Sequence, residues 1–237
     1  PLAAGNPGVA PPRNQNNYRL TDADRIGEGS IKQKFRQNVA AIELLFKIEG
    51  DQRAATAVEK KTLAKFSGWG GMPQVFATAD QVSGWSAEQT KLRLLLEPAL
   101  YDAAKATVLN AHYTSPTVVR AMFAAVSRLG FTHGRILEPA CGLGHFFGLM
   151  PEEMAARSHL IGIEIDPLTA RLAKTIYSDA DIRAQPFEES VVPTNSVDLA
   201  ISNVPFGDYA PGDRRSNPRK FLIHDFFFIA ALERVRP

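Results

Sequence analysis

The sequence predicts an α/β fold in which a parallel sheet follows a helical N-terminal region. Apolar residues recur at helical spacing in the first part of the chain. After residue 116, short apolar runs alternate with helical stretches, and glycines lie at the junctions. Such alternation gives parallel sheets with right-handed crossovers. Because ligands of these sheets bind at the carboxyl ends of the strands, the residues that follow each strand are the candidate site.

The composition is that of a packed, soluble chain. Of the 237 residues, 45% are hydrophobic and 22% are charged, which is enough apolar material for a core. No apolar run approaches the roughly 20 residues that span a bilayer, and no signal-peptide pattern opens the sequence, so we expect a cytoplasmic protein. The lone cysteine, Cys141, excludes a disulfide framework and a multi-cysteine zinc site.

Charge is distributed unevenly along the chain. Residues 25–66 contain nine basic and five acidic residues, residues 138–208 contain four and eleven, and residues 209–237 contain six and three. An acidic middle between basic segments fits a small-molecule site beside surfaces that contact a polyanion. Ordinary solvated faces would give the same distribution, so charge alone does not decide between the two.

The first third is predicted to be helical. Residues 1–17 are mostly Pro, Gly and Asn with almost nothing to bury, which indicates a disordered leader or linker. From Ser30 onward, apolar residues at helical spacing predict a helix that ends at Gly50. Asp51 can cap a second helix, which the glycines after Ser67 end.

A third helix is predicted from Ser86, because Ser86 to Gln89 fits a capping box. Pro98 kinks or ends that helix. These helices define a helical N-terminal region over residues 18–109.

Helices and strands alternate in the remainder, residues 110–237. Strands are predicted at the apolar runs 135–137, 160–163, 182–184 and 197–201, and helices at 116–129, 167–177 and about 221–235. The last of these strands is the strongest by its apolar pattern. Only four strands can be identified before Pro237, so we expect a core that is incomplete at its C-terminus, with further strands beyond.

The first candidate site is the turn E-P-A-C-G-L-G-H-F, residues 138–146, between a strand and a helix. Gly142 and Gly144 let a ligand approach the backbone, and the helix start presents free N–H groups. The spacing is not G-x-G-x-x-G, and the carboxylate of Glu138 repels phosphate but suits a ligand with an amino group and a sulfonium. A plain strand–helix turn is the alternative.

Two further candidates follow other strands. Glu164 ends the second strand, where a carboxylate can accept both hydroxyls of a ribose; it could also cap the next helix with Asp166. Asn203 follows the last strand, in S-N-V-P-F-G. Its side-chain oxygen and the next backbone carbonyl can hold an exocyclic amine, while Phe206 stacks on a flipped base. Together, Glu138 and Glu164 describe an adenosyl ligand without phosphates.

These motifs resemble those of S-adenosylmethionine-dependent adenine-N6 DNA methyltransferases of the gamma type, in which a segment like Asn110–Pro116 precedes the cofactor loop. More narrowly, the chain resembles the methylase region of large methylase–helicase proteins of phages and conjugative plasmids. That resemblance lies in Gly68–Gly71, Asn110–Pro116, Asn203–Tyr209 and Phe221–Phe227. It covers roughly residues 60–237 and implies a Rossmann-like methyltransferase core.

The resemblance implies that S-adenosyl-L-methionine is the cofactor and gives each matching residue a role. The methionine end would be held by Tyr113, Thr114, Ser115, Glu138, Ala140 and Gly142. Glu164 would bind the ribose, Ile165 and Phe187 would contact the adenine, and Gln185 could replace an acidic residue usual near that position. The catalytic segment would be Asn203, Val204, Pro205 and Phe206, with Val204 where most adenine methylases have Pro.

A basic cluster follows the catalytic segment, where DNA phosphates would pass unless it is simply a solvated loop: Arg214, Arg215, Arg219 and Lys220. Trp69 and Cys141 are expected to pack in the core; the histidines lack metal-ligand spacing, so no metal is expected. The expected partners are DNA and a helicase region of the same longer chain. An RNA or protein-glutamine methyltransferase, or a non-catalytic DNA-binding module, remains an open alternative.

Overall fold

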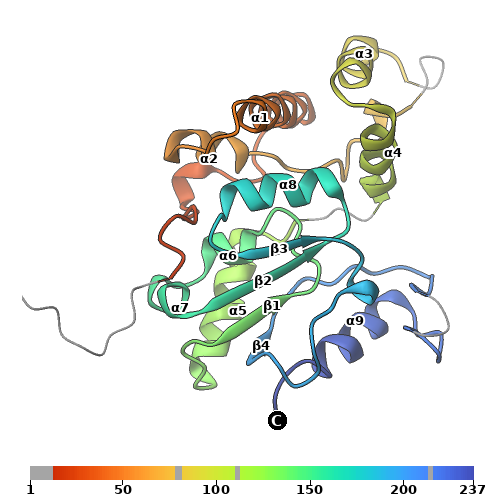
Figure 1. Ribbon diagram of the computed structural model, residues 1–237. Helices are drawn as coiled ribbons and strands as arrows, with labels where there is room; N and C mark the ends of the chain where they lie inside the picture. The colour runs from red at the N-terminus through yellow and green to blue at the C-terminus, as the bar shows by residue number, and fades with distance from the viewer. Residues whose placement is uncertain (1–12, 78–81, 110–112, 213–215) are drawn as a thin grey trace, which may run out of the picture.

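The computed structural model describes residues 13–77, 82–109, 113–212 and 216–237 (Figure 1). Within these ranges the strands form one parallel sheet: β1 (Arg135–Glu138), β2 (His159–Glu164), β3 (Asp181–Ala184) and β4 (Leu199–Ala200). Their spatial order is β3-β2-β1-β4: β2 and β3 are added on one side of β1 and β4 on the other, which makes the boundary between β1 and β4 the switch point of a doubly wound sheet. The predicted Rossmann-like α/β class with a helical N-terminal region is confirmed.

The helices fall into two groups. Before the sheet come α1 (Ile31–Gly50), α2 (Ala57–Leu63), α3 (Ser86–Leu95) and α4 (Pro98–Ala106), with the short turns η1 (Asp22–Asp24), η2 (Pro73–Val75) and η3 (Thr107–Leu109). Around the sheet lie α5 (Pro116–Arg128), α6 (His145–Leu149), α7 (Glu152–Arg157), α8 (Pro167–Ile176), η4 (Phe187–Glu189) and α9 (Ile223–Leu232).

Successive strand residues face opposite sides of the sheet, and each side has its own apolar cluster. Ile136 and Leu160 pack with α5, α6 and α8, whereas the neighbouring Leu137 and Ile161 pack with Phe187 of η4 and with α9. Figure 1 shows α8 and α9 on opposite sides of the strands. Helices therefore cover both faces, as a parallel sheet requires.

The helical N-terminal region lies on the outer side of α8, with α1 and α2 next to it (Figure 1). Ile42 of α1 and Leu63 of α2 are fully buried in the same apolar cluster as Leu172 of α8. Trp69 is 1% exposed and packs edge-on against Phe76, with ring centroids 5.5 Å apart, which confirms its packing role. The helical layer and the sheet thus share one hydrophobic core.

Residues 13–17 lie against the sheet layer, although their composition places them in the predicted leader. The backbone N–H of Arg13 donates to the carbonyl of Ala156 (2.7 Å), and Asn16 donates to the carboxylate of Asp179 through its backbone (2.8 Å) and its side chain (3.0 Å). Polar side chains hold this segment in place without apolar burial, which is why composition does not indicate it. The earlier part of that leader lies outside the described residues.

Two predicted helix caps are wrong. The N-cap of α2 is Thr56 and not Asp51: the Thr56 hydroxyl accepts from the backbone of Glu59 (3.3 Å), and the Glu59 carboxylate accepts from the backbone of Thr56 (2.8 Å). Ser86 lies inside α3 as its first residue, so the capping box predicted there does not form, and Trp85 is the N-cap. In both places several polar residues could cap, and packing decides which one does.

The strand predicted at residues 197–201 is shorter than expected. Only Leu199 and Ala200 pair in register with β1. The side chain of Asp198 instead accepts the backbone N–H of Arg135 (2.7 Å), and Val197 forms a parallel bridge with Val235 on its other side. The helix before that bridge ends at Leu232, because the following residues extend along Val197.

Candidate functional site

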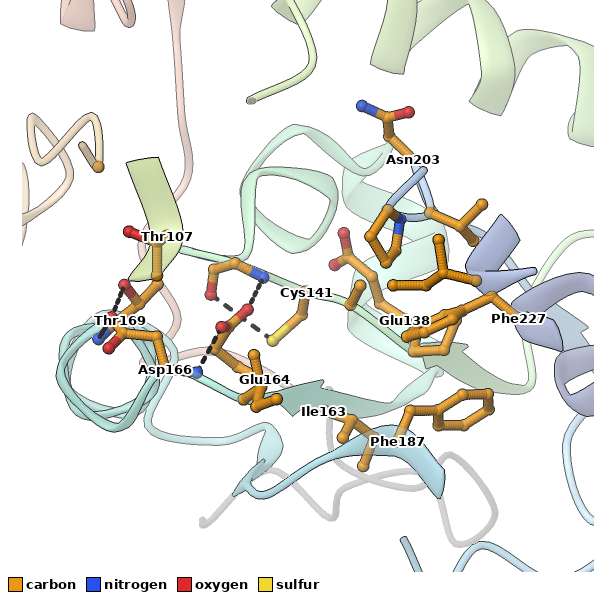
Figure 2. Close-up of a pocket in the computed structure, with 18 of the residues that line it drawn as sticks. Thr107, Glu138, Cys141, Ile163, Glu164, Asp166, Thr169, Phe187, Asn203 and Phe227 are labelled. Carbon is orange, nitrogen blue, oxygen red and sulfur yellow. Dashed lines mark hydrogen bonds between the residues drawn. The ribbon is translucent and has the colours of Figure 1, made fainter. Parts of the chain in front are cut away.

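A cavity of about 510 Å³ opens where β1, β2 and β4 end, at the switch point of the sheet (Figure 2). The sequence-predicted residues that line it are Tyr113, Thr114, Glu138, Ala140, Gly142, Glu164, Ile165, Gln185, Phe187, Asn203, Val204, Pro205 and Phe206. Ser115 is not among the lining residues, because its hydroxyl accepts the backbone N–H of Val118 (3.4 Å) as the N-cap of α5.

The turn after β1 is held tightly by backbone hydrogen bonds. The N–H of Cys141 donates to the carbonyl of Ile163 (2.8 Å), and the N–H of Gly144 donates to the carbonyl of Cys141 (2.8 Å). Gly142 and Gly144 both have positive φ, 52° and 84°, which side-chain-bearing residues rarely adopt. Cys141 is 4% exposed, and burial raises the pKa of its thiol well above the ordinary value, which fits a packing residue.

Glu164 joins this turn to the start of α8. One carboxylate oxygen accepts the N–H of Gly142 (2.8 Å) and the other accepts the N–H of Asp166 (2.8 Å), as the dashed lines in Figure 2 show. Burial raises the pKa of Glu164 to about 7, although both backbone donors act to lower it. Asp166 caps α8 by accepting the N–H of Thr169 (2.9 Å), so Glu164 adds to the cap and also faces the cavity.

Glu138 is a buried carboxyl with an unsatisfied oxygen. The residue is 2% exposed, and its Oε2 atom has no hydrogen-bond partner. Burial, and then the charge of Glu164, raises the pKa of this carboxyl well above its ordinary value. In Figure 2 the side chain rises from the end of β1 toward the loop that carries Asn203. Because buried polar atoms are nearly always paired, we expect a bound ligand to supply the hydrogen-bond partner of this Glu138 oxygen.

The cavity contains several carboxyl groups and, among the described residues, no Lys or Arg side chain to pair with them. Its acidic lining residues are Glu138, Glu164, Asp166 and Glu188, and no Lys or Arg is among the lining residues in the part of the chain that the structure describes. The Oδ1 atom of Asp166 is also buried without a partner. Such a cavity disfavours phosphate and suits a cationic ligand that also carries hydroxyl or amine donors.

Apolar side chains form the opposite wall. Phe187 is 3% exposed and packs on the rings of Phe226 (6.4 Å between centroids) and Phe227 (5.1 Å) of α9. Ile165 also lines the cavity and is 66% exposed. Both residues line the cavity and give it apolar surface that a planar ring could contact.

The loop after β4 forms the mouth of the cavity. The N–H of Ile201 donates to the carbonyl of Leu137 (3.0 Å), which fixes the start of the loop beside β1. Asn203 is exposed, and Phe206 is 63% exposed. Tyr209, which the sequence does not single out as a site residue, also lines the cavity, and its carbonyl accepts the N–H of Ile223 at the start of α9 (2.9 Å).

Several lining residues come from the helical N-terminal region and were not predicted. They are Gly68, Ala103, Ala106 and Thr107. His145 was also missed as a lining residue: it is 4% exposed, both ring nitrogens lack partners, and burial lowers its pKa to about 4, so it is neutral at pH 7. His145 belongs to the candidate turn 138–146 without a predicted role. Of the four residues from the helical region only Gly68 belongs to a recognised motif, because no local pattern shows which helix faces a distant cavity.

The predicted basic residues lie only partly in the described chain. Arg219 and Lys220 are exposed on the loop before α9. Buried Asn217 shapes that loop: its side chain donates to the carbonyls of Pro211 (3.1 Å) and Phe221 (2.8 Å). Since Pro211 lines the cavity, its hydrogen bond with Asn217 links the cavity lining to the residues just before Arg219 and Lys220. Arg214, Arg215 and the segment Asn110–His112 lie outside the described residues.

Metal clusters and membrane-spanning helices are both absent from the described ranges. These residues include no group of three or more His, Cys, Asp or Glu side chains that could hold a metal ion. Within the same ranges, every helix is too short or too polar to cross a membrane.

No protein-family model and no curated protein matches the sequence. Solved structures with a similar chain arrangement include the methyltransferase subunit of a type I restriction-modification system from Streptococcus thermophilus (11% identity, 86% of this chain and 66% of that chain, TM-score 0.47). A candidate class I S-adenosylmethionine-dependent methyltransferase from Listeria monocytogenes gives 13% identity, 87% and 71% coverage and a TM-score of 0.46.

A third structure is the modification subunit of a candidate type I restriction enzyme from Vibrio vulnificus YJ016 (20% identity, 67% of this chain, TM-score 0.40). The present chain spans 36% of that protein and 66% of the Streptococcus subunit. At such identities and TM-scores, the ligand of the cavity has to be argued from its own residues.

Proposed function

We propose that the cavity binds S-adenosyl-L-methionine and that the chain, as a site-specific DNA methyltransferase, transfers the methyl group to the N6 amine of adenine. One observation carries the proposal: Glu138 and Glu164, from adjacent strand ends, line the same cavity as the segment Asn203–Phe206. The first pair suits an adenosyl cation, and the segment suits a planar amine. Because both groups line one cavity, the methyl group of the bound cation and the target amine can be brought together for transfer.

The lining residues fit this cofactor. The unpaired oxygen of Glu138 and the absence of lining Lys or Arg in the described chain favour a ligand with an ammonium and a sulfonium. Glu164 lies where a carboxylate can accept the ribose hydroxyls. The adenine would lie between Ile165 and Phe187, with Gln185 as a donor or acceptor at its edge. When bound, S-adenosylmethionine supplies an electrophilic methyl group.

The methionine end would be held at the other end of the cavity. The residues proposed for it are Tyr113, Thr114, Glu138, Ala140 and Gly142, all of which line the cavity, whereas Ser115 is engaged in capping α5. Ser115 would therefore act by fixing the start of α5 rather than by touching the ligand.

The segment after β4 would prepare the target amine. The side-chain oxygen of Asn203 and the carbonyl of Val204 would accept its two N–H groups, which turns the nitrogen lone pair toward the methyl carbon. The same acceptors would stabilise the positive charge that develops on nitrogen as the N–C bond forms and the bond between the methyl carbon and sulfur breaks, with its electron pair left on sulfur. The methylated amine would then release one proton to water. Phe206 would stack on the flipped base. Because only its carbonyl is used, Val204 can occupy a position where Pro is usual.

Nucleic acid is favoured over a protein amide by the surface beside the mouth. Arg219 and Lys220 are exposed just before α9, close to Asn217, which contacts Pro211 of the cavity lining, and there they can contact phosphates. We propose DNA as the polyanion, and a helicase region of the same longer chain as a partner, on the resemblance of the motifs.

Removing the Asn203 amide tests both function and site. We expect Asn203→Ala to reduce methyl transfer at least about a thousandfold, the scale of losing a preorganised group at the reacting atoms, while cofactor affinity changes less than about twofold. Labelled S-adenosylmethionine would be incubated with DNA, RNA and protein together, and the product identified by mass spectrometry after digestion. Asp208→Ala, an exposed change in the same loop, is the matched control.

The outcomes separate the alternatives. N6-methyladenine in DNA that disappears with Asn203→Ala supports the proposal. Methylated RNA or methylated glutamine as the product would show that RNA or protein, and not DNA, is the substrate. Cofactor binding without any methyl transfer would indicate a non-catalytic DNA-binding module. Equal loss of binding and transfer in Asn203→Ala would contradict the assignment of Asn203.

A further inference from the structure

Tyr113 connects the helical N-terminal region to the turn after β1. A Cβ atom added to Gly68 would lie 2.8 Å from Cε2 of the Tyr113 ring, and one added to Gly142 would lie 2.9 Å from Cε1. Both glycines have positive φ, 67° and 52°. The ring therefore lies between two backbone segments that approach it closely because neither carries a side chain.

The Gly68 side of this arrangement is fixed by Asn38 in the middle of α1. Asn38 is fully buried, and its amide donates to the carbonyl of Gly68 (2.6 Å). Its side-chain oxygen accepts the backbone N–H of Ser67 (2.8 Å) and the Ser67 hydroxyl (3.2 Å). The Asn38 side chain thus makes the hydrogen bonds that these backbone groups would otherwise make within a helix or a sheet.

The Gly142 side belongs to the cavity. The N–H of Gly142 donates to Glu164, the residue proposed to bind the ribose, and the Tyr113 ring lies 4.9 Å from the ring of His145. Tyr113, His145 and both glycines line the cavity. Contacts therefore run without a gap from α1, through Gly68 and Tyr113, to the turn after β1.

We propose that Asn38 is a positioning residue for the cavity: by fixing the Ser67–Gly68 loop it holds Tyr113 against the turn after β1 and so sets the affinity for the adenosyl ligand. The ligand's identity rests on the proposed function; the positioning role does not. Without Asn38, the buried Gly68 carbonyl and the Ser67 N–H lose their partners, and the loop must move to find others. Tyr113 then loses one of the two surfaces that confine it.

The test is a double-variant cycle on cofactor affinity. We expect Asn38→Ala to raise the Kd for S-adenosylmethionine about tenfold, the effect of losing one buried hydrogen-bonded support, with DNA affinity unchanged. In a Tyr113→Ala background, Asn38→Ala should raise the Kd less than about twofold, because the residue through which it acts is gone. Calorimetry on the full chain, at a temperature where every variant is folded, measures each Kd.

Thr56→Ala is the matched control. It removes the cap of α2 in the same helical layer, so it should lower the melting temperature without changing the Kd. Gly68→Ala is the second variant, which displaces the Tyr113 ring directly if Asn38→Ala does not fold. Equal effects of Asn38→Ala in the wild-type and Tyr113→Ala backgrounds, or a Kd change in Thr56→Ala of the same size, would overturn the proposal.

Hydrogen exchange without ligand keeps this inference separate from the proposed function. Asn38→Ala should speed exchange of the Gly142 amide about tenfold while amides of β3 keep their rates. If wild-type protein fails to bind S-adenosylmethionine, the proposed function is wrong but this measurement still applies. An unchanged Gly142 rate would refute the positioning role.

Discussion

Glu164 faces two opposing influences. The amides of Gly142 and Asp166 stabilise its ionised form, but burial has the larger effect and raises its pKa to about 7. In the ligand-free protein at pH 6, only about a tenth of the molecules would carry the ionised carboxylate. Since an ionised carboxylate accepts hydrogen bonds from two hydroxyls at once, the ribose site should work best above pH 7.

Affinity for an adenosyl ligand should therefore rise with pH. We expect the Kd of 5′-methylthioadenosine to fall about tenfold between pH 6 and pH 8, as Glu164 loses its proton. This probe carries the ribose and lacks the amino acid, so its own charge stays constant over that range. Calorimetry of Glu164→Gln should show a Kd independent of pH; a slope like that of the wild type would assign the titration to another group.

The same group should make the ligand-free fold less stable as pH rises. The folded-state pKa is above the ordinary 4.5, so the folded chain binds a proton that the unfolded chain has already lost between about pH 4.5 and 7. Glu164 thus lowers the free energy of unfolding across that window, while it increases ligand affinity. Stability and binding have opposite pH dependences at one carboxyl.

Residues at strand ends were predictable, and those on the helical wall were not. Glu138, Glu164 and Asn203 each follow a predicted strand, and the carboxyl ends of parallel strands meet at one edge. Gly68 and Thr107 line the same cavity only because the helical layer packs on α8, a long-range contact that no local pattern contains. The motif Gly68–Gly71 singles out Gly68, but it does not predict that Gly68 lines the cavity.

At the scale of elements, the turn between β1 and α6 depends on a glycine whose replacement is costly. Gly144 has φ 84°, and an added Cβ would lie 2.6 Å from the buried ring of Tyr177. Gly130, after α5, has φ 93° but nothing within 4 Å of such a Cβ. Both positions would strain any residue that carries a Cβ atom, and they differ in the packing around that atom.

Alanine at these positions separates the two costs. We expect Gly130→Ala to lower the free energy of unfolding by about 1 kcal/mol from strain alone, and Gly144→Ala by about 3 kcal/mol, because overpacking adds to strain. Urea unfolding of both variants measures the difference. Equal losses would mean that the Tyr177 ring moves aside freely.

Long helices were predicted more accurately than caps and the last strand. Apolar spacing predicts α1, α5 and α8 to within one residue at each end, because each buries one continuous stripe. The apolar run at 197–201 predicts one strong strand, yet Val197 and Leu199 pair with different neighbours. Which backbone lies beside each residue is decided by the rest of the fold.

At the scale of the whole molecule, the acidic cavity lies beside exposed cations. We expect Arg219→Ala with Lys220→Ala to weaken DNA binding and to reduce the salt dependence of log Kd by about two units of slope, one for each phosphate that is no longer neutralised. Cofactor affinity should stay unchanged, since neither residue lines the cavity. Fluorescence titration of labelled DNA at several salt concentrations measures the slope.

Arg128 is the control for this measurement. It is exposed at the end of α5, which leads into the start of β1 at the opposite edge of the sheet from the cavity. Arg128→Ala should leave the salt slope as it is. A similar decrease in both variants would indicate general attraction to a basic chain instead of a defined DNA surface.

One apolar cluster contains Leu20, Ile42 of α1, Leu92 of α3, Phe146 of α6 and Ile201 after β4. Within the described ranges, the helical layer and the sheet share this cluster with no solvated gap between them. Unfolding of either region would therefore expose the core of the other to water. The two regions that look separate along the sequence are thermodynamically one cooperative unit. A substitution that destabilises the helical layer therefore also favours unfolding of the cavity, and it does so only near the temperature at which the whole chain melts.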